Sequence, residues 1–106
     1  MTKAEMRYVM ANTLEGWKPI VRALIRQISG HVKWRKLEHF AVQQVKEKFG
    51  GLRFYISGGD YEIAGMISMA EAMSVNTCEV CGCPGERRGG GWIRTLCDTH
   101  DKERNG

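Results

Sequence analysis

The chain lacks the segments that mark membrane and exported proteins. No apolar run approaches the ~20 residues that a transmembrane helix needs. Residues 1–5, MTKAE, lack the charged-then-apolar layout of a signal peptide and are typical of a helix start. We therefore expect a soluble, cytoplasmic protein with reduced thiols and no membrane partner. The length of 106 residues suits one small domain, or a domain with a small appendage.

The sequence also lacks the familiar catalytic motifs. HExxH and GxSxG are absent, and Gly58-Gly59 has neither the lysine nor the spacing of a phosphate-binding loop. His31 and His39 are isolated in a basic stretch, and residues 92–96 contain no histidine that would activate water in a small zinc nuclease. The sequence therefore predicts a protein that is not an enzyme.

Cysteine is missing from the first 77 residues and is confined to the segment 78–100. Two pairs of ligands, each with a two-residue gap, follow one another there, and such pairs converge on one tetrahedral ion. The expected ligands of one structural Zn²⁺ are Cys78, Cys81, Cys97 and His100. Four protein ligands leave no open position for water. Two alternatives stay open: ligation by Cys83 in place of Cys81, and disulfides in place of metal.

The same segment has little to bury. Gly89-Gly90-Gly91 predicts a turn and residues 92–96 a strand, which together suggest a hairpin. The apolar side chains available for burial are Val80, Trp92, Ile93 and Leu96. The binding free energy of a structural zinc, on the order of 10–16 kcal/mol in small peptides, is also folding free energy. We therefore expect residues 75–106 to form a zinc-finger module, ribbon or treble-clef-like, that folds around the metal.

Residues 1–74 predict an α+β core of three amphipathic helices and a β-hairpin. A Thr2–Glu5 capping box starts the first helix, which Gly16 ends. The second helix begins near Pro19 and ends at Ser29-Gly30, and Asp60 caps a third helix over residues 61–74. The expected inward-facing residues are Met6, Val9, Met10 and Leu14, then Ile20, Val21, Leu24, Ile25 and Ile28, then Ile63, Met66, Ile67, Ala70 and Met73.

The stretch QVKEKFGGLRFYIS predicts a β-hairpin with a Gly50-Gly51 turn. Pairing Phe49 with Leu52 gives the hairpin one mainly apolar face. The opposite face carries Lys46, Lys48, Arg53 and Tyr55. Because opposed like charges are destabilising, such a face suggests an anionic ligand; the alternative is an ordinary solvated face. A helix over residues 40–49 is the competing assignment.

Positive charge is concentrated in the first 60 residues, which contain 11 Lys/Arg and 5 Asp/Glu. Residues 61–106 contain 5 Lys/Arg and 7 Asp/Glu. Residues 31–39 show no clear period and interleave basic residues with a tryptophan, a composition suited to phosphate contact and base stacking. The alternative is a surface connector whose tryptophan packs on the helices. The expected nucleic-acid-binding residues form one patch: Lys33, Trp34, Arg35, Lys36, Lys46, Lys48, Arg53 and Tyr55.

Two resemblances accompany these motifs. CEVCGCPGERR followed by TLCDTH resembles the zinc finger of DksA/TraR-type RNA polymerase modulators, although His100 stands where those proteins have cysteine. Residues 1–77 show no pair of long coiled-coil helices, so this resemblance implies a metal site and not a mechanism. VKEKFGGLRFYISGGD, with the following helix and finger, resembles a group of small phage and prophage proteins. That resemblance implies a one-domain α+β protein with a terminal zinc finger in the bacterial host cell.

Together these features predict a non-catalytic, zinc-stabilised binding protein. Its basic face would engage nucleic acid or a nucleoprotein machine of the host. The alternative is an inhibitor or modulator of a host protein complex, such as RNA polymerase or a defence system, that binds through an apolar or mixed surface.

Overall fold

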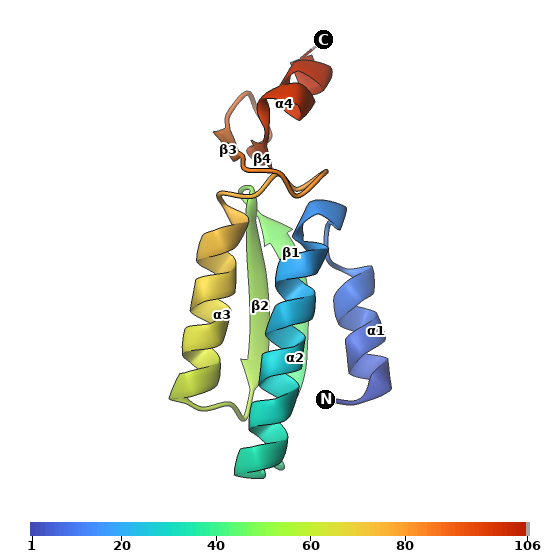
Figure 1. Ribbon diagram of the computed structural model, residues 1–106, viewed down its shortest axis with the longest axis vertical. Coiled ribbons are helices and arrows are strands. Elements are labelled where there is room, and N and C mark those ends of the chain that lie inside the picture. Colours follow the sequence, from blue (N-terminus) through green and yellow to red (C-terminus); the bar gives the residue numbers. More distant parts are fainter. Residues whose placement is uncertain (106) are drawn as a thin grey trace.

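The computed structural model describes residues 1–105 as a mixed helical and sheet fold. In chain order the elements are α1 (Lys3–Ala11), the 3₁₀ helix η1 (Glu15–Trp17), α2 (Lys18–Arg35), β1 (Ala41–Lys48), β2 (Gly51–Ser57), α3 (Tyr61–Ser74), β3 (Glu86–Arg88), β4 (Arg94–Leu96) and α4 (Asp98–Asn105). The strands form two separate antiparallel hairpins, β1–β2 and β3–β4. The predicted α+β class is confirmed. The molecule measures 50 × 24 × 21 Å, with the second hairpin and α4 stacked on one end of the first (Figure 1).

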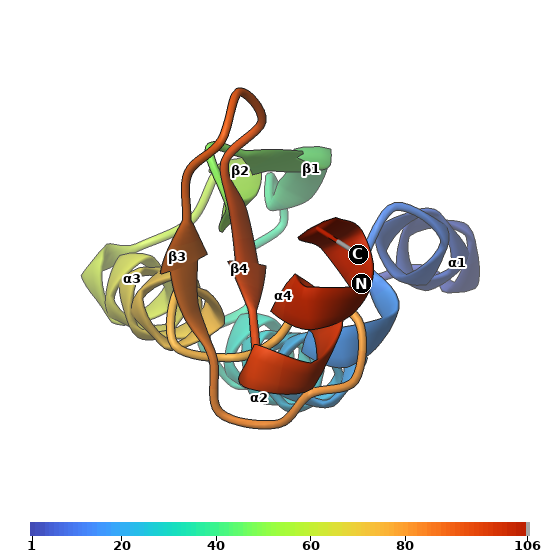
Figure 2. The ribbon, with the colours of Figure 1, turned by 90° about the horizontal axis from the view of Figure 1, so that it is seen from above.

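The hydrophobic core lies between the β1–β2 hairpin and the helices α1, α2 and α3, which all cover one face of that hairpin (Figures 1 and 2). Its buried members are Val9, Trp17, Val21, Leu24, Ile28, Val45, Leu52, Phe54, Ile63, Ile67 and Ala70. All of them precede the cysteine-containing segment. The core is therefore assembled without apolar side chains from β3, β4 or α4.

The first helix starts as predicted and ends earlier. The capping box between Thr2 and Glu5 is present, with hydrogen bonds of 2.9 and 3.0 Å. The hydroxyl of Thr13 donates to the carbonyl of Val9 at 2.6 Å, and this bond competes with continuation of the helix. Leu14, predicted to face inward, lies beyond α1 and is exposed. Trp17 of η1 is buried in its place.

The predicted end of the second helix at Ser29-Gly30 is wrong, since α2 continues to Arg35. An exposed glycine inside a helix costs only about 1 kcal/mol, and Ile28 and His31 on either side are buried. The helix ends where Lys36 adopts the left-handed conformation, with φ 55°. The predicted connector is therefore largely helical. Trp34 does not pack on the helices, because 70% of its surface is exposed.

The first hairpin forms, but the predicted register is wrong. The turn residues are Phe49 and Gly50, with φ of 54° and 77°, and Lys48 pairs with Gly51. Two-residue hairpin turns of this kind require positive φ at both central positions. The pairing is displaced by two residues from the predicted one, so each face keeps its predicted composition. The competing helix over residues 40–49 is wrong, because β1 occupies this segment.

Both edges of this two-stranded sheet are covered by side chains from the flanking helices. Four strand N–H groups find acceptors on these helices: Glu5 for Val42 at 2.9 Å, the Tyr8 hydroxyl for Val45 at 3.3 Å, Ser74 for Leu52 at 2.9 Å, and Glu71 for Phe54 at 3.0 Å. Buried backbone groups need such partners. Helices α1 and α3 thus complete the hydrogen bonding that neighbouring strands would provide in a larger sheet.

The third helix confirms its predicted cap and most of its inward face. Asp60 accepts from the N–H of Ile63 at 3.0 Å. Ile63, Ile67 and Ala70 are buried, and Met66 packs at the edge of the core. Met73 is exposed, contrary to prediction. Ser74 is fully buried, with its hydroxyl bound to the sheet edge.

Candidate metal centre and basic surface

Four predicted ligands converge at the end of the molecule opposite the N-terminus of α3. The cluster consists of Cys78, Cys81, Cys97 and His100, whose ligand atoms all lie within 4.8 Å of one another. Two ligands belong to the loop after α3, Cys97 directly precedes α4, and His100 lies within that helix. The Cys81 and Cys97 sulfurs are 3.8 Å apart, and His100 Nδ1 lies 3.2 Å from the Cys97 sulfur. These groups could hold one metal ion. Cys83 is exposed and lies outside the cluster.

The thiols of the cluster differ in their readiness to ionise. Burial opposes ionisation of Cys78, but hydrogen bonds from the backbone of Cys97, Cys81 and Val80 outweigh it and lower the pKa of this thiol to about 6. A backbone hydrogen bond from Cys83 favours the Cys81 thiolate, yet burial and the adjacent thiols prevail and raise the pKa of Cys81. The pKa of Cys97 is also raised, because burial and two thiols outweigh the backbone of His100. Crowded sulfurs of this kind are fully ionised only beside a cation.

The cluster is docked on η1 through backbone contacts. The Gly16 N–H donates to the carbonyl of Glu79 at 2.8 Å. A Cβ at Gly16 would overlap the carbonyl oxygen of Cys78. The indole N–H of Trp17 donates to the carbonyl of Thr77 at 2.9 Å. The chain that carries the first two ligands is therefore held directly against the start of α2.

A second connection joins the cluster to the turn of the first hairpin. The buried Glu79 receives a hydrogen bond from the Arg94 guanidinium, and its N–H donates to the carbonyl of Thr95 at 3.0 Å. The Thr95 hydroxyl donates to the carbonyl of Gly50. Sequence reasoning missed these residues. In the sequence alone, nothing near Glu79 or Arg94 separates this partly buried pair from surface charges.

The cysteine-containing segment buries less apolar surface than predicted. Leu96 is fully buried, but Val80, Trp92 and Ile93 are exposed. The predicted strand over residues 92–96 is shorter than expected, since β4 begins at Arg94. Polar contacts instead fix α4, because Arg88 of β3 binds Asp98 at 2.9 Å. The pKa of Asp98 is lowered by this hydrogen bond.

The predicted basic face of the first hairpin is present. Lys46 faces Arg53 across the two strands, and the Lys46 ammonium lies 6.0 Å from the ring centre of Tyr55. Lys48 follows on the same face near the turn. Among residues 1–105, none of these three cations forms an ion pair with a carboxylate. Like charges therefore stand opposed here without internal neutralisation.

The other half of the predicted patch lies elsewhere. Lys33, Trp34, Arg35 and Lys36 are at the C-terminal end of α2, at the bottom of Figure 1, whereas the hairpin turn lies at the top beside the second hairpin. Arg35 is paired with Glu62 at 3.1 Å, and its guanidinium lies 4.8 Å from the Trp34 ring centre. The eight predicted residues thus form two separate groups and not one patch.

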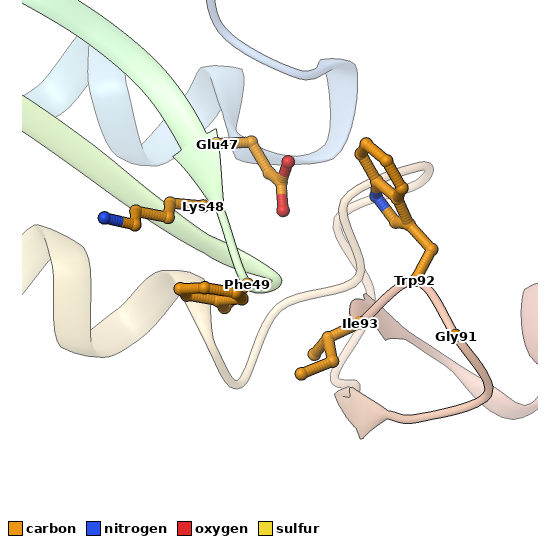
Figure 3. A pocket seen from close by; sticks show the side chains of 6 residues that line it. All are labelled: Glu47, Lys48, Phe49, Gly91, Trp92 and Ile93. Atoms are coloured by element: carbon orange, nitrogen blue, oxygen red, sulfur yellow. The ribbon is translucent and has the colours of Figure 1, made fainter.

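An apolar cavity of about 300 Å³ lies between the turn of the first hairpin and the loop of the second (Figure 3). Its lining residues are Glu47, Lys48, Phe49, Gly91, Trp92 and Ile93. The Glu47 carboxylate points into the space between Phe49 and Trp92 and accepts from the Gly50 N–H at 2.7 Å. Phe49 and Trp92 are 60% and 69% exposed. Both rings are therefore available to solvent on either side of the cavity.

No protein-family model, curated protein or solved structure matches this chain. No helix within residues 1–105 is both long enough and apolar enough to cross a membrane.

Proposed function

We propose that the protein is a non-catalytic, zinc-stabilised nucleic-acid-binding protein. Zinc suits the donor set, since thiolates and imidazole are its usual structural ligands. Zn–S bonds of about 2.3 Å and Zn–N bonds of about 2.0–2.1 Å place sulfurs roughly 3.8 Å apart and sulfur and nitrogen roughly 3.6 Å apart in a tetrahedron. The corresponding distances are 3.8 Å for Cys81–Cys97, 3.6 Å for Cys78–His100 and 3.2 Å for Cys97–His100. These distances support a zinc site.

The metal would act structurally. All four ligands come from the protein, so no position is left for a reactive water. The order of loop ligands, short hairpin and helix with the last ligand corresponds to a treble-clef-like finger. The finger buries few apolar side chains, and metal binding supplies the missing folding free energy.

The observation that carries the binding function is the solvent-facing side of the β1–β2 hairpin. Lys46, Lys48 and Arg53 lie there on the same face as Tyr55, and none has a carboxylate partner in residues 1–105. Phosphate groups neutralise such cations, and an exposed aromatic ring offers a surface on which a base stacks. Contacts of this type bind without sequence preference, with Kd values of about 10⁻⁴–10⁻⁶ M at physiological salt.

A titration with labelled single-stranded and duplex oligonucleotides at two salt concentrations tests this function. The variant Lys46→Ser/Lys48→Ser removes two hairpin cations, and Lys33→Ser/Lys36→Ser removes the same charge at the far end of α2. The hairpin variant should lose binding and the control should retain it. Absence of binding by the wild type at low salt rejects the function. Equal losses in both variants reject the hairpin as the binding face.

A second candidate is a protein–protein modulator, favoured by the apolar cavity beside Phe49 and Trp92. A partner side chain inserted there would bury both exposed rings. Pull-down from bacterial lysate, with and without nuclease, separates the two functions. A partner retained after nuclease treatment and lost with Trp92→Ser favours the modulator, whereas partners lost on nuclease treatment favour nucleic acid.

A further inference from the structure

Two arginines from different hairpins converge beside Gly51. A Cβ at this position would lie 3.2 Å from Nη2 of Arg87 on β3 and 3.4 Å from Nη1 of Arg53 on β2. Gly51 has no side chain to fill that space, so one nitrogen of each guanidinium group approaches the same point beside its Cα. The nearby apolar contact is the side chain of Val75, at 3.2 Å from the same point.

Neither arginine is neutralised within the described chain. Arg53 donates one hydrogen bond, to the carbonyl of Leu52 at 3.1 Å, and no ion pair within residues 1–105 involves Arg53 or Arg87. Glu71 lines the same depression as Arg53, and its carboxylate accepts from the N–H of Phe54 without forming an ion pair with Arg53. Lys46, opposite Arg53 in the sheet, adds a third positive charge.

The other arginines of the β3–β4 hairpin behave differently. Arg88 binds Asp98 and Asp101, and Arg94 binds Glu79. The finger therefore supplies carboxylates to its structural arginines and none to Arg87. Two neighbouring guanidinium groups without a carboxylate partner repel each other, and an anion bound between them would remove that repulsion.

We propose that Arg53 and Arg87 together bind one phosphate group of a nucleic-acid backbone. Guanidinium groups present paired N–H donors that match phosphate oxygens, and charge-assisted bonds of this kind are strong. This arginine pair rests on the proposed nucleic-acid-binding function and extends that surface from the first hairpin onto the finger. It also gives the metal a role in binding, because the fold around the metal positions β3 and hence Arg87.

Four proteins test the pair with a labelled single strand: wild type, Arg53→Ser, Arg87→Ser and the double variant. Each single substitution should weaken binding, and the double variant, which releases the shared phosphate, should lower the salt slope by about one unit. The double variant should lose less than the product of the two single losses, because both side chains serve the same phosphate. Lys102→Ser removes an exposed finger cation on α4 and should leave the affinity within about twofold, as expected for a charge outside the site.

A second titration uses inorganic phosphate and follows the arginine side-chain N–H signals by NMR. Phosphate should shift the signals of both arginines in the wild type, and neither single variant should respond. If wild type and Arg87→Ser bind the oligonucleotide with equal affinity and equal salt slope, Arg87 does not contact the phosphate. The arginine pair is then rejected, and the proposed function is unaffected. If the oligonucleotide does not bind but inorganic phosphate still shifts both arginine signals, the pair is a phosphate site whose ligand is not nucleic acid. If neither the oligonucleotide nor phosphate binds, both the arginine site and the proposed nucleic-acid-binding function are wrong.

Discussion

The Cα of Gly16 lies against the carbonyl oxygen of Cys78, so closely that a Cβ at residue 16 would overlap that oxygen. The same Cβ would lie 2.6 Å from the carbonyl carbon of Glu79. Because these are backbone atoms of the metal-binding loop, they cannot move aside without displacing the ligands. Gly16→Ala should therefore lower the free energy of unfolding by about 1–3 kcal/mol, as for overpacked cores, and weaken zinc retention.

Gly65→Ala provides the matched control. A Cβ at Gly65 meets nothing within 4 Å, and the residue lies inside α3. Alanine should stabilise the helix there by roughly 0.5–1 kcal/mol and leave zinc retention unchanged. Thermal unfolding and zinc content of the two variants decide the matter. Equal behaviour of the two variants would contradict the close contact at Gly16.

Zinc content should distinguish Cys81 from Cys83. Cys81→Ser removes one of the four converging ligands and should abolish retention of the metal, whereas Cys83→Ser removes an exposed thiol outside the cluster and should leave one zinc per chain. Metal analysis of the purified variants gives the answer. Loss of zinc only from Cys83→Ser would show that the ligand set is wrong.

Removal of the metal should unfold residues 75–105 before the rest. The core cluster ends at Ala70 and includes no finger side chain, so residues 1–74 keep their packing. The hydrogen bond from Trp17 to Thr77 should be lost, and the Trp17 indole N–H should then exchange faster with solvent. Circular dichroism and hydrogen exchange during chelator titration follow both events. Loss of all helical signal in one transition would contradict this order.

Acid should weaken the start of α3 through Asp60. The hydrogen bond from the Ile63 N–H, and then the contact with His31 Nε2 at 2.7 Å, hold the pKa of Asp60 below its ordinary value of 3.8. The unfolded chain therefore binds this proton more readily. The stabilisation is complete above the ordinary value and is lost as pH falls through the lower folded value.

Asp60→Asn isolates this charge effect, because asparagine also caps helices. Urea unfolding of wild type and variant between pH 6 and about pH 2 should show a steeper decline in the wild type below pH ~4. Parallel curves would contradict the role of the Asp60 charge.

Phe49 is an exposed residue whose backbone conformation lowers the stability of the protein. Its φ of 54° is unfavourable for a large side chain, and asparagine is preferred in such turns. Phe49→Asn should therefore raise the free energy of unfolding by about 1 kcal/mol, on the scale of left-handed strain. Chemical denaturation measures the change. A destabilised variant would mean that the ring contributes to packing despite its exposure.

The features that sequence predicted best are those encoded by neighbouring residues. The capping box at Thr2, the cap at Asp60 and the convergence of the Cys78–Cys81 and Cys97–His100 pairs each depend on a spacing of a few positions. The alternation of the first hairpin fixed its two faces even though the register was displaced.

The predictions from sequence were wrong where contacts between residues far apart in the chain determine the local structure. Gly51 suggested a turn residue, but its missing side chain makes room for Arg53, Val75 and Arg87. Gly30 suggested a helix end, yet the buried Ile28 and His31 carry α2 through it. Arg87 and Arg88 are adjacent arginines that the sequence does not distinguish. They differ in the structure because, among residues 1–105, carboxylates lie beside Arg88 and not beside Arg87.

The covered edges of the β1–β2 hairpin limit how a partner can bind. A bare strand edge recruits further strands, either from a peptide ligand or from another copy of the chain. Here acceptors on α1 and α3 already occupy four N–H groups along the edges of the two strands. An added strand would have to displace a helix. A partner can therefore reach the hairpin through the face that the helices do not cover. The covered edges also protect the folded protein against edge-to-edge aggregation.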